Sequence, residues 1–260
     1  MKKAIVAASF GTTYEKALEN SISALENTFA ARFPEYEVRR AFTSRHVISA
    51  LRKKGSSVDT VSEALERLIA EGFAEVIVQP THIIGGNEYE RLCREAEMFR
   101  DRFKRLDIGS PLISDDDDIG AVCGFFEKKF GGEKAVAIMG HGTEHAANEV
   151  YQKLWDRFAA DGFSSIFVGA MEGSLTIADI IPKLKSGGYH EIVVTPLLLV
   201  AGEHAYNDMA GDEPSSWRSV LEAEGFGFVP VIKGLGEYEE IRSLYAEHLG
   251  RTINCQTITL

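Results

Sequence analysis

Three residues in the second half of the chain are of types that bind metal ions. His141 stands between two glycines in MGHG, Glu172 stands in GAMEG, and His204 closes the run PLLLVAGEH. Two imidazoles and one carboxylate form a borderline ligand set that suits divalent Fe, Co, Ni or Zn. Three protein ligands also leave coordination positions open for a reacting molecule. We therefore expect a metal site that takes part in a reaction.

His145 competes with His141 for the role of ligand. The two are four positions apart, like the histidines of zinc proteases that carry HExxH on a helix. In HGTEH, however, the glutamate is misplaced, and Gly142 suits a turn better than a helix interior. We expect the glycines to leave room for a ligand beside His141, and His145 to lie in the first turns of the next helix. Glu172 has an alternative role as a helix-capping acid.

The pattern of the chain predicts parallel sheets that could bring these residues together. Segments rich in Val and Ile alternate with helical segments, which is typical of parallel strands covered by helices. Strands are expected at AIVAASF, EVRRAF, AEVIVQP, KAVAIMG, SIFVGA, EIVVTPLLLV and FGFVPVI, and a short extended piece is expected to end in SPLI. Helices are expected near residues 14–33, 47–54, 58–71, 87–103, 115–130, 143–160, 177–186, 215–224 and 237–249. Three consecutive strand ends would then carry His141, Glu172 and His204 to the edge where α/β sheets bind ligands.

The two halves of the chain resemble each other. KAIVAASFGTT aligns with KAVAIMGHGTE, which places Phe10 opposite His141. EVIVQPTHIIGGNE aligns with EIVVTPLLLVAGEH, which places Glu88 opposite His204. The alignment indicates a duplicated α/β unit.

The repeat predicts an α/β fold of two similar Rossmann-like lobes, each with a parallel sheet flanked by helices, and an active-site cleft between them. We place the amino-terminal lobe at residues 1–130 and the carboxyl-terminal lobe, with the metal ligands, at residues 131–260. The four acids at 115–118 are expected to cap a helix rather than bind metal, because carboxylates are favoured at helix amino termini.

Composition narrows the classes of partner. The net charge of −11 over 260 residues argues against nucleic acid, because phosphate binding needs a basic face. No apolar run reaches the length of about eighteen residues that a membrane span needs, and the start of the chain is better explained as a strand than as a signal peptide. The three cysteines, widely spaced and without CxxC, indicate reduced thiols in a cytoplasmic protein.

Several motifs together resemble a known family. MGHG, GAMEG and PLLLVAGEHAYNDMAGD, with SFGTTY near the start and SWRSVLEAEG and GLGE near the end, resemble the anaerobic sirohydrochlorin cobaltochelatases of cobalamin biosynthesis. The likeness covers nearly the whole chain. The longest motif is specific, whereas the glycine–histidine strand end is shared with other type II chelatases, including ferrochelatases.

The resemblance implies a chelatase-like fold and an enzyme of the lyase class. It implies that His141, Glu172 and His204 hold Co²⁺ and are the catalytic residues, and that Co²⁺ enters sirohydrochlorin while two protons leave. Cobalt is then a substrate and no cofactor is tightly bound, although Fe²⁺, Ni²⁺ or Zn²⁺ could occupy the same ligands. The implied partners are sirohydrochlorin and cobalt, without nucleic acid or membrane, and family habit suggests a homo-oligomer.

Sirohydrochlorin carries eight carboxylates, so an acidic protein needs a local basic surface to bind it. Arg45 and His46 follow a predicted strand in the basic run VRRAFTSRHVISALRKK and are the best anchors, because Arg can grip a carboxylate with two hydrogen bonds. The residues at 52–54 instead suggest a solvated helix end. The other expected substrate-binding residues are Phe10, His82 and Glu88, and for His82 a structural role is equally plausible.

Alternatives remain open at this stage. The same ligands suit iron or nickel insertion into sirohydrochlorin or a related tetrapyrrole, and they suit a non-catalytic tetrapyrrole or metal carrier. A zinc hydrolase would need a general base, for which no separate motif is present. The tail RTINCQTITL could be an extended arm, a partner surface or disordered.

Overall fold

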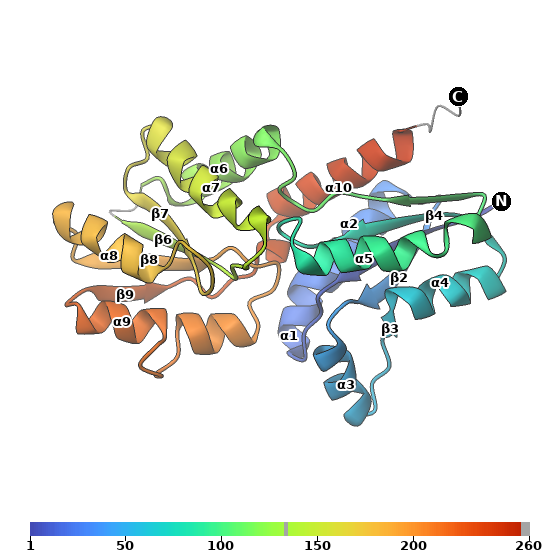
Figure 1. The fold of residues 1–260 in the computed structure, drawn as a ribbon, viewed down its shortest axis with the longest axis horizontal. Coiled ribbons are helices and arrows are strands. Elements are labelled where there is room, and N and C mark those ends of the chain that lie inside the picture. Colours follow the sequence, from blue (N-terminus) through green and yellow to red (C-terminus); the bar gives the residue numbers. More distant parts are fainter. Residues whose placement is uncertain (133–134, 256–260) are drawn as a thin grey trace. The chain divides into compact units, whose positions relative to one another are not determined.

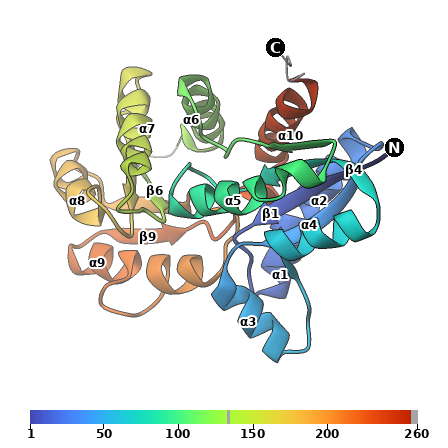
Figure 2. The same cartoon turned by 45° about the vertical axis from the view of Figure 1, so that its right-hand side comes forward.

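Two parallel β-sheets organise the fold in the computed structural model, which describes residues 1–132 and 135–255 (Figures 1 and 2). Each sheet belongs to its own unit. The first unit comprises Met1–Leu112 and the chain from Gly236 onward, and the second comprises Ile113–Leu235. The α/β class with parallel sheets in two units is confirmed.

The division between the units differs from the predicted boundary at residue 130. Helix α6 (Asp116–Phe130) packs on α7 (Glu149–Ala160) and therefore belongs to the second unit. The last helix, α10 (Glu239–Asn254), packs on α2 (Ala24–Arg32) and returns to the first unit. Local sequence pattern does not show this, because packing between distant helices decides it.

The first sheet has five strands in the order β3-β2-β1-β4-β5, all parallel. Its strands are β1 (Lys2–Ser9), β2 (Glu37–Phe42), β3 (Asp59–Thr60), β4 (Phe73–Pro80) and β5 (Arg105–Ile108). Val6 of β1 pairs with Arg39 on one side and with Val78 on the other. Because the strands are parallel, their carboxyl ends share one edge of the sheet.

Helices cover both faces of this sheet. Ala4 and Val6 of β1 pack in one apolar core with Leu65 of α4 (Val61–Ala70) and Leu92 of α5 (Asn87–Glu97). Successive strand residues point to opposite faces, and α2 and α10 lie on the other face (Figure 1). The remaining elements are α1 (Glu15–Ala17), η1 (Leu18–Ser23), α3 (Arg45–Lys53), η2 (Arg100–Arg102) and η5 (Leu235–Glu237).

The second sheet has four parallel strands in the order β7-β6-β8-β9. They are β6 (Val136–Gly140), β7 (Ile166–Ala170), β8 (Glu191–Pro196) and β9 (Gly227–Pro230). Met139 of β6 pairs with Gly169 of β7 and with Pro196 of β8, and it packs in one apolar core with Ile180 and Leu221. The further elements are η3 (Ala146–Asn148), α8 (Ile177–Ser186), η4 (Ala205–Met209) and α9 (Trp217–Ala223).

Two of the predicted strands differ in place or extent. The extended piece expected to end in SPLI is a strand only over Arg105–Ile108, and the preceding helix α5 ends at Glu97, before the predicted end at Phe103. The strand expected to run through EIVVTPLLLV ends at Pro196, since proline has no N–H to donate to the ladder.

Of two further predictions, the helix cap at residues 115–118 is confirmed and the prediction for the carboxyl-terminal tail is partly wrong. Asp115 caps α6 by accepting a hydrogen bond from the N–H of Asp118 (2.9 Å), as expected. An extended or disordered tail is wrong for residues 251–254, which complete α10, a partner surface there stays untested, and residues 256–260 lie outside the described part of the chain. Lys134, in the expected strand KAVAIMG, also lies outside the described residues. None of the described helices has the length and apolar character required to cross a membrane.

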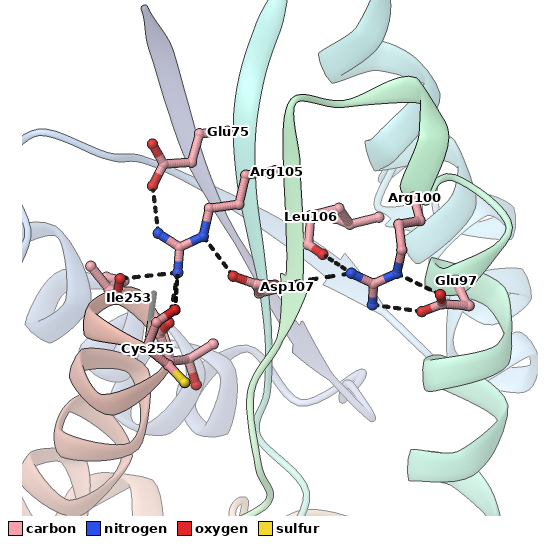
Figure 3. A network of polar contacts seen from close by, with 9 residues as sticks. Glu75, Glu97, Arg100, Arg105, Leu106, Asp107, Ile253 and Cys255 are labelled. Atoms are coloured by element: carbon pink, nitrogen blue, oxygen red, sulfur yellow. Dashed lines mark hydrogen bonds and ion pairs between the residues drawn. The ribbon is translucent and has the colours of Figure 1, made fainter. Parts of the chain in front are cut away.

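A network of charges holds α10 to the amino-terminal end of the first sheet (Figure 3). Glu75 pairs with Lys3 (3.0 Å) and Arg105 (3.2 Å) and accepts a hydrogen bond from the hydroxyl of Tyr36. Burial would raise the pKa of Glu75, but these three partners together lower it. Arg105 also donates to the carbonyl of Ile253 (3.0 Å) at the end of α10. Within the first sheet, this network lies at the edge opposite the carboxyl ends of the strands.

Candidate metal centre

His141 follows β6 directly, on a loop that requires its two glycines. Gly142 has φ of 84°, and a Cβ there would stand 1.9 Å from the carbonyl oxygen of Glu172. A Cβ on Gly140 would stand 2.1 Å from Cε1 of Tyr151. The N–H of Gly142 donates to the Tyr151 hydroxyl (3.1 Å). Close packing of the protein on itself therefore excludes side chains at both positions, and the predicted room for a ligand beside His141 stays a prediction.

Glu172 lies beside His141 because the strand pairing continues past the ends of β6 and β7. Its N–H donates to the carbonyl of His141 (3.1 Å), and its side chain is exposed. The capping alternative for Glu172 is wrong. Thr176 caps α8 instead, in a capping box with Asp179, whose carboxylate accepts from the N–H of Thr176 (2.8 Å).

His204 does not follow a strand directly, contrary to expectation. β8 ends at Pro196, and His204 lies eight residues further on, as the N-cap of the π-helical turn η4. Even so, the centroids of the His204 and His141 rings are 4.8 Å apart, with the ring planes at 87°. The structure thus brings together the two histidines that the sequence predicted as metal ligands.

Hydrogen bonds fix the orientation of both rings. Nδ1 of His141 lies 3.0 Å from the carbonyl oxygen of Gly142, and Nδ1 of His204 lies 2.7 Å from Oδ2 of Asp208. A carbonyl or carboxylate oxygen can only accept, so each Nδ1 carries the hydrogen. In both neutral rings Nε2 then keeps its lone pair, which is the form of histidine that binds a metal.

The ring of His145 carries its hydrogen on the other nitrogen, Nε2. The prediction that His145 lies inside a helix is wrong. It caps the short turn η3, where its Nδ1 accepts a hydrogen bond from the N–H of Ala147 (3.1 Å). In the neutral ring the hydrogen must then be on Nε2, so neither nitrogen offers a lone pair to a metal. His145 therefore differs from His141 in its tautomer and is not suited to bind a metal as it stands.

The third predicted ligand does not complete a site as the side chains stand. Within residues 1–132 and 135–255, no group of three His, Cys, Asp or Glu side chains is placed to hold a metal ion. The backbone of Glu172 is fixed against His141, but its exposed carboxylate is not gathered with the two imidazoles.

The expected substrate-binding residues lie near the carboxyl edge of the first sheet. Phe10 follows β1 and is 45% exposed, which is unusual for a large apolar side chain. Arg45 and His46 are the first two residues of α3, and both are exposed. His82 comes shortly after the end of β4, and Glu88 lies in the first turn of α5.

His82 is an enclosed neutral histidine. Its Nε2 lies 3.4 Å from Oγ1 of Thr43, and its Nδ1 is buried without a hydrogen-bond partner among the described residues. Burial, and then the positive charge of Arg91, lower the pKa of His82 to about 4. Arg91 also pairs with Glu88 (2.6 Å) and donates to the carbonyl of Thr43 (2.6 Å). Glu88 therefore holds Arg91 in place, and Arg91 in turn contacts Thr43 at this edge of the sheet.

Most arginines of the basic run are already engaged. Arg39 pairs with Glu71 (2.6 Å), and Arg52 pairs with Glu63 (2.8 Å). Arg45, by contrast, makes no ion pair within the part of the chain that the structure describes. Its exposed guanidinium can take a carboxylate from solution.

Sequence reasoning missed several residues that shape the two edges. Tyr151, Asp208 and Arg91 act through contacts with residues on other elements or turns, as described above. Asp208 alone left a local signal, because it stands four positions after His204 and helical turns bring such pairs together.

Two solved structures of chelatases have the same fold as this chain. SirB from Bacillus subtilis with Fe³⁺ covers 97% of this chain and 96% of its own, with a TM-score of 0.65 at 15% identity. The cobalt complex of the sirohydrochlorin chelatase SirB from Bacillus subtilis subspecies spizizenii covers 97% and 95%, with a TM-score of 0.62 at 15% identity. The fold is that of the chelatases.

The chain belongs to the cobalt chelatase (CbiK) family, whose sequence model matches residues 3–254. It is 38% identical over 258 residues to the sirohydrochlorin cobaltochelatase of Salmonella typhimurium, covering 98% of this chain and 97% of the relative. It is 36% identical over 262 residues to the sirohydrochlorin cobaltochelatase CbiKC of Nitratidesulfovibrio vulgaris, covering 97% and 91%. The family resemblance read from the motifs is confirmed.

Proposed function

We propose that this chain is a sirohydrochlorin cobaltochelatase of cobalamin biosynthesis, as its relatives are named. The observation that carries the proposal is the pair of facing histidines, His141 and His204, each with Nε2 available, in a member of the cobalt chelatase family. Soft-to-borderline nitrogen ligands suit Co²⁺.

His141 and His204 hold the incoming Co²⁺, and Glu172 turns its exposed carboxylate to it as a third ligand. The backbone bond between Glu172 and His141 keeps that carboxylate on the same edge of the sheet. The pair alone binds Co²⁺ incompletely, which favours release of the metal into the macrocycle, since unfilled positions remain for the ring nitrogens.

The reaction balances as an exchange of cations. Co²⁺ enters the ring and two pyrrolic N–H protons leave, so the charge at the ring centre is unchanged. Imidazoles are suited to receive such protons near neutral pH, as is the carboxylate of Glu172. His141, His204 and Glu172 are therefore proposed as both metal ligands and catalytic residues.

The residues of the first unit bind the substrate in this proposal. Arg45 and His46 supply exposed cationic or hydrogen-bonding groups for its carboxylates, and the exposed ring of Phe10 offers an apolar face to the macrocycle. His82, whose lowered pKa keeps it neutral, supports this edge from within through the contact of its Nε2 with Thr43. Glu88 acts by holding Arg91.

Turnover in a defined mixture tests the function. Purified protein is mixed with excess sirohydrochlorin and Co²⁺, and the absorbance change of metallation is followed. An enzyme continues beyond one equivalent of product, whereas a carrier stops at one. Parallel reactions with Fe²⁺ and Ni²⁺ compare kcat/KM for the alternative metals. Absence of cobalt turnover by folded protein would overturn the proposal.

A crystal soaked in Co²⁺ tests the ligands independently of turnover. Nitrogen and oxygen ligands are expected at about 2.0–2.2 Å from the metal, the range for a borderline divalent ion. The metal should lie on Nε2 of His141 and of His204. Cobalt bound to His145 and Glu149, with His141 turned away, would exclude this assignment.

Two further aspects of the function are also proposals. All three cysteines are free thiols, which supports a cytoplasmic location. Self-association is proposed from the family likeness alone, and sedimentation of the purified protein would decide it.

A further inference from the structure

Asp208 holds the ring of His204. Oδ2 of Asp208 lies 2.7 Å from Nδ1 of His204, four positions earlier in the chain. His204 is the N-cap of the π-helical turn η4, and Asp208 lies within this turn. The spacing places both side chains on one side of the turn, and π-helical turns are frequent at functional sites. The contact is therefore local and built into the turn.

This contact decides which nitrogen of His204 carries the hydrogen. A carboxylate can only accept, so Nδ1 donates and Nε2 keeps its lone pair. His141 reaches the same state through a different acceptor, the backbone carbonyl of Gly142. His145, whose Nδ1 accepts a backbone N–H, is in the opposite state. The two proposed ligands, His141 and His204, therefore share one tautomer, and His145 has the other.

The two proposed ligands differ in what holds them. The partner of His141 is a neutral carbonyl of the backbone, whereas the partner of His204 is an anionic side chain. A carboxylate that accepts from a ligating imidazole fixes the ring and raises its basicity as a ligand. Metal affinity should therefore depend on Asp208 in a way that has no counterpart at His141.

We propose that Asp208 is a positioning residue that keeps His204 in the tautomer with Nε2 free and so strengthens divalent-metal binding at the candidate centre. This inference rests on the proposed function, because it takes His204 to be a ligand. Asp208 acts through His204 and does not itself touch the metal.

A purely structural role predicts different results. The side chains of His204 and Asp208 are 42% and 50% exposed, and exposed ion pairs contribute little to folding stability. Replacing Asp208 should therefore leave thermal unfolding almost unchanged. Its effects should be confined to the proton on His204 and to metal binding.

The first experiment uses metal-free protein and reads the ring directly. Imidazole ¹⁵N spectra at pH 8, with the His204 signals assigned by comparison with His204→Gln, report which nitrogen carries the hydrogen. We expect Nδ1–H in the unmodified protein and a shift toward Nε2–H in Asp208→Ala. Nε2–H in the unmodified protein, or an unchanged ring in Asp208→Ala, would overturn the proposal.

The second experiment titrates Co²⁺ into protein without tetrapyrrole and follows heat and the visible cobalt spectrum. Asp208→Ala should bind about 10–100-fold more weakly, the usual loss when such a supporting partner is removed. Asp208→Glu should recover part of the affinity. Asp212→Asn is the matched control, because Asp212 is an acid of the same segment that pairs with Arg218 and is 92% exposed.

The two experiments distinguish failure of this inference from failure of the proposed function. If the unmodified protein binds Co²⁺ and Asp208→Ala binds it equally well, the positioning role is wrong while the metal centre stands. If His141→Ala and His204→Ala bind Co²⁺ as well as the unmodified protein does, the metal centre itself is wrong. In that case the inference fails with it, whatever the ring spectra show.

Discussion

The imidazole rings of His141 and His204 lie 4.8 Å apart between centroids, with their planes at 87°. Each ring is held through Nδ1, one by a backbone carbonyl and the other by Asp208. The lone pairs on Nε2 are thereby left available on both residues. This relationship underlies the first prediction.

His141→Ala and His204→Ala should each lower kcat/KM for cobalt insertion by about a hundredfold or more, since a metal-holding group contributes several kcal/mol to the transition state. Glu172→Gln should impair the reaction severely, and His145→Ala should keep most of the activity. Steady-state rates with sirohydrochlorin and Co²⁺ provide the measurement. Circular dichroism checks that each variant folds. A nearly inactive His145→Ala would contradict the tautomer argument.

Arg45→Ala should raise KM for sirohydrochlorin by about tenfold, the usual worth of a charged hydrogen bond. Co²⁺ affinity should hardly change, because Arg45 is not one of the proposed metal ligands. Arg52→Ala is the matched control, since Arg52 is a neighbouring arginine already paired with Glu63. An unchanged KM in folded Arg45→Ala would remove Arg45 from the substrate site.

Gly142→Ala should destabilise the protein more than Gly162→Ala does. Both glycines have positive φ, 84° and 89°, which costs an alanine about 1–2 kcal/mol. Only at Gly142 would the new Cβ collide with backbone, at 1.9 Å from the carbonyl oxygen of Glu172, while Gly162 faces open space. The collision should add about 1–3 kcal/mol to the loss. Urea unfolding of the two variants measures the difference, and equal losses would refute the packing argument.

His82 should make the protein less stable as the pH falls from about 6.5 to 4. Burial lowers the pKa of His82 to about 4, so in this window the unfolded chain binds a proton that the folded chain does not. Stability is therefore full above pH 6.5 and declines below it, by up to about 3 kcal/mol at pH 4.

Urea unfolding at a series of pH values checks this sign. The stability difference between the unmodified protein and His82→Gln should shrink as the pH is lowered through this window. Thr43→Val removes only the 3.4 Å contact with Nε2 and should retain the pH dependence. A stability difference that does not vary with pH would show that His82 is not enclosed in solution.

Arg105→Ala should cost about 2 kcal/mol of folding stability, because it leaves the partly buried carboxylate of Glu75 with one cation fewer and the end of α10 without its donor. Arg100→Ala is the control. Arg100 makes an exposed pair with Glu97, three positions earlier in the chain, which is worth less than about 1 kcal/mol, and it donates to the carbonyl of Leu106 (Figure 3). Thermal unfolding of both variants provides the comparison. Equal losses would show that the network does not secure α10.

Much of this protein could be predicted from local patterns in its sequence. Runs of Val and Ile predicted the strands, since parallel strands covered by helices are buried on both faces. Glycines on both sides of His141 marked a strand end, and the motifs identified the family. These features depend on residues that are neighbours in the chain, so they can be read without coordinates.

The prediction for His204 was wrong about its setting, and its role as a metal ligand stays a prediction. A continuous apolar run suggested a strand leading up to it, but Pro196 ends that strand. What carries His204 to His141 is the irregular chain after β8 and the turn η4. Hydrophobic runs look alike in strands and in buried loops, so periodicity could not separate the two.

Only the tertiary structure decided which unit each helix joins and which nitrogen each histidine presents. α10 belongs with the first sheet because its side chains pack on α2, far away in the sequence. The states of His141, His145 and His204 follow from hydrogen-bond acceptors or donors about 3 Å away, at positions that depend on turn geometry. A sequence specifies which residues carry chemical groups. Distances and hydrogen-bond directions, which determine what those groups can do, arise only when the chain has folded.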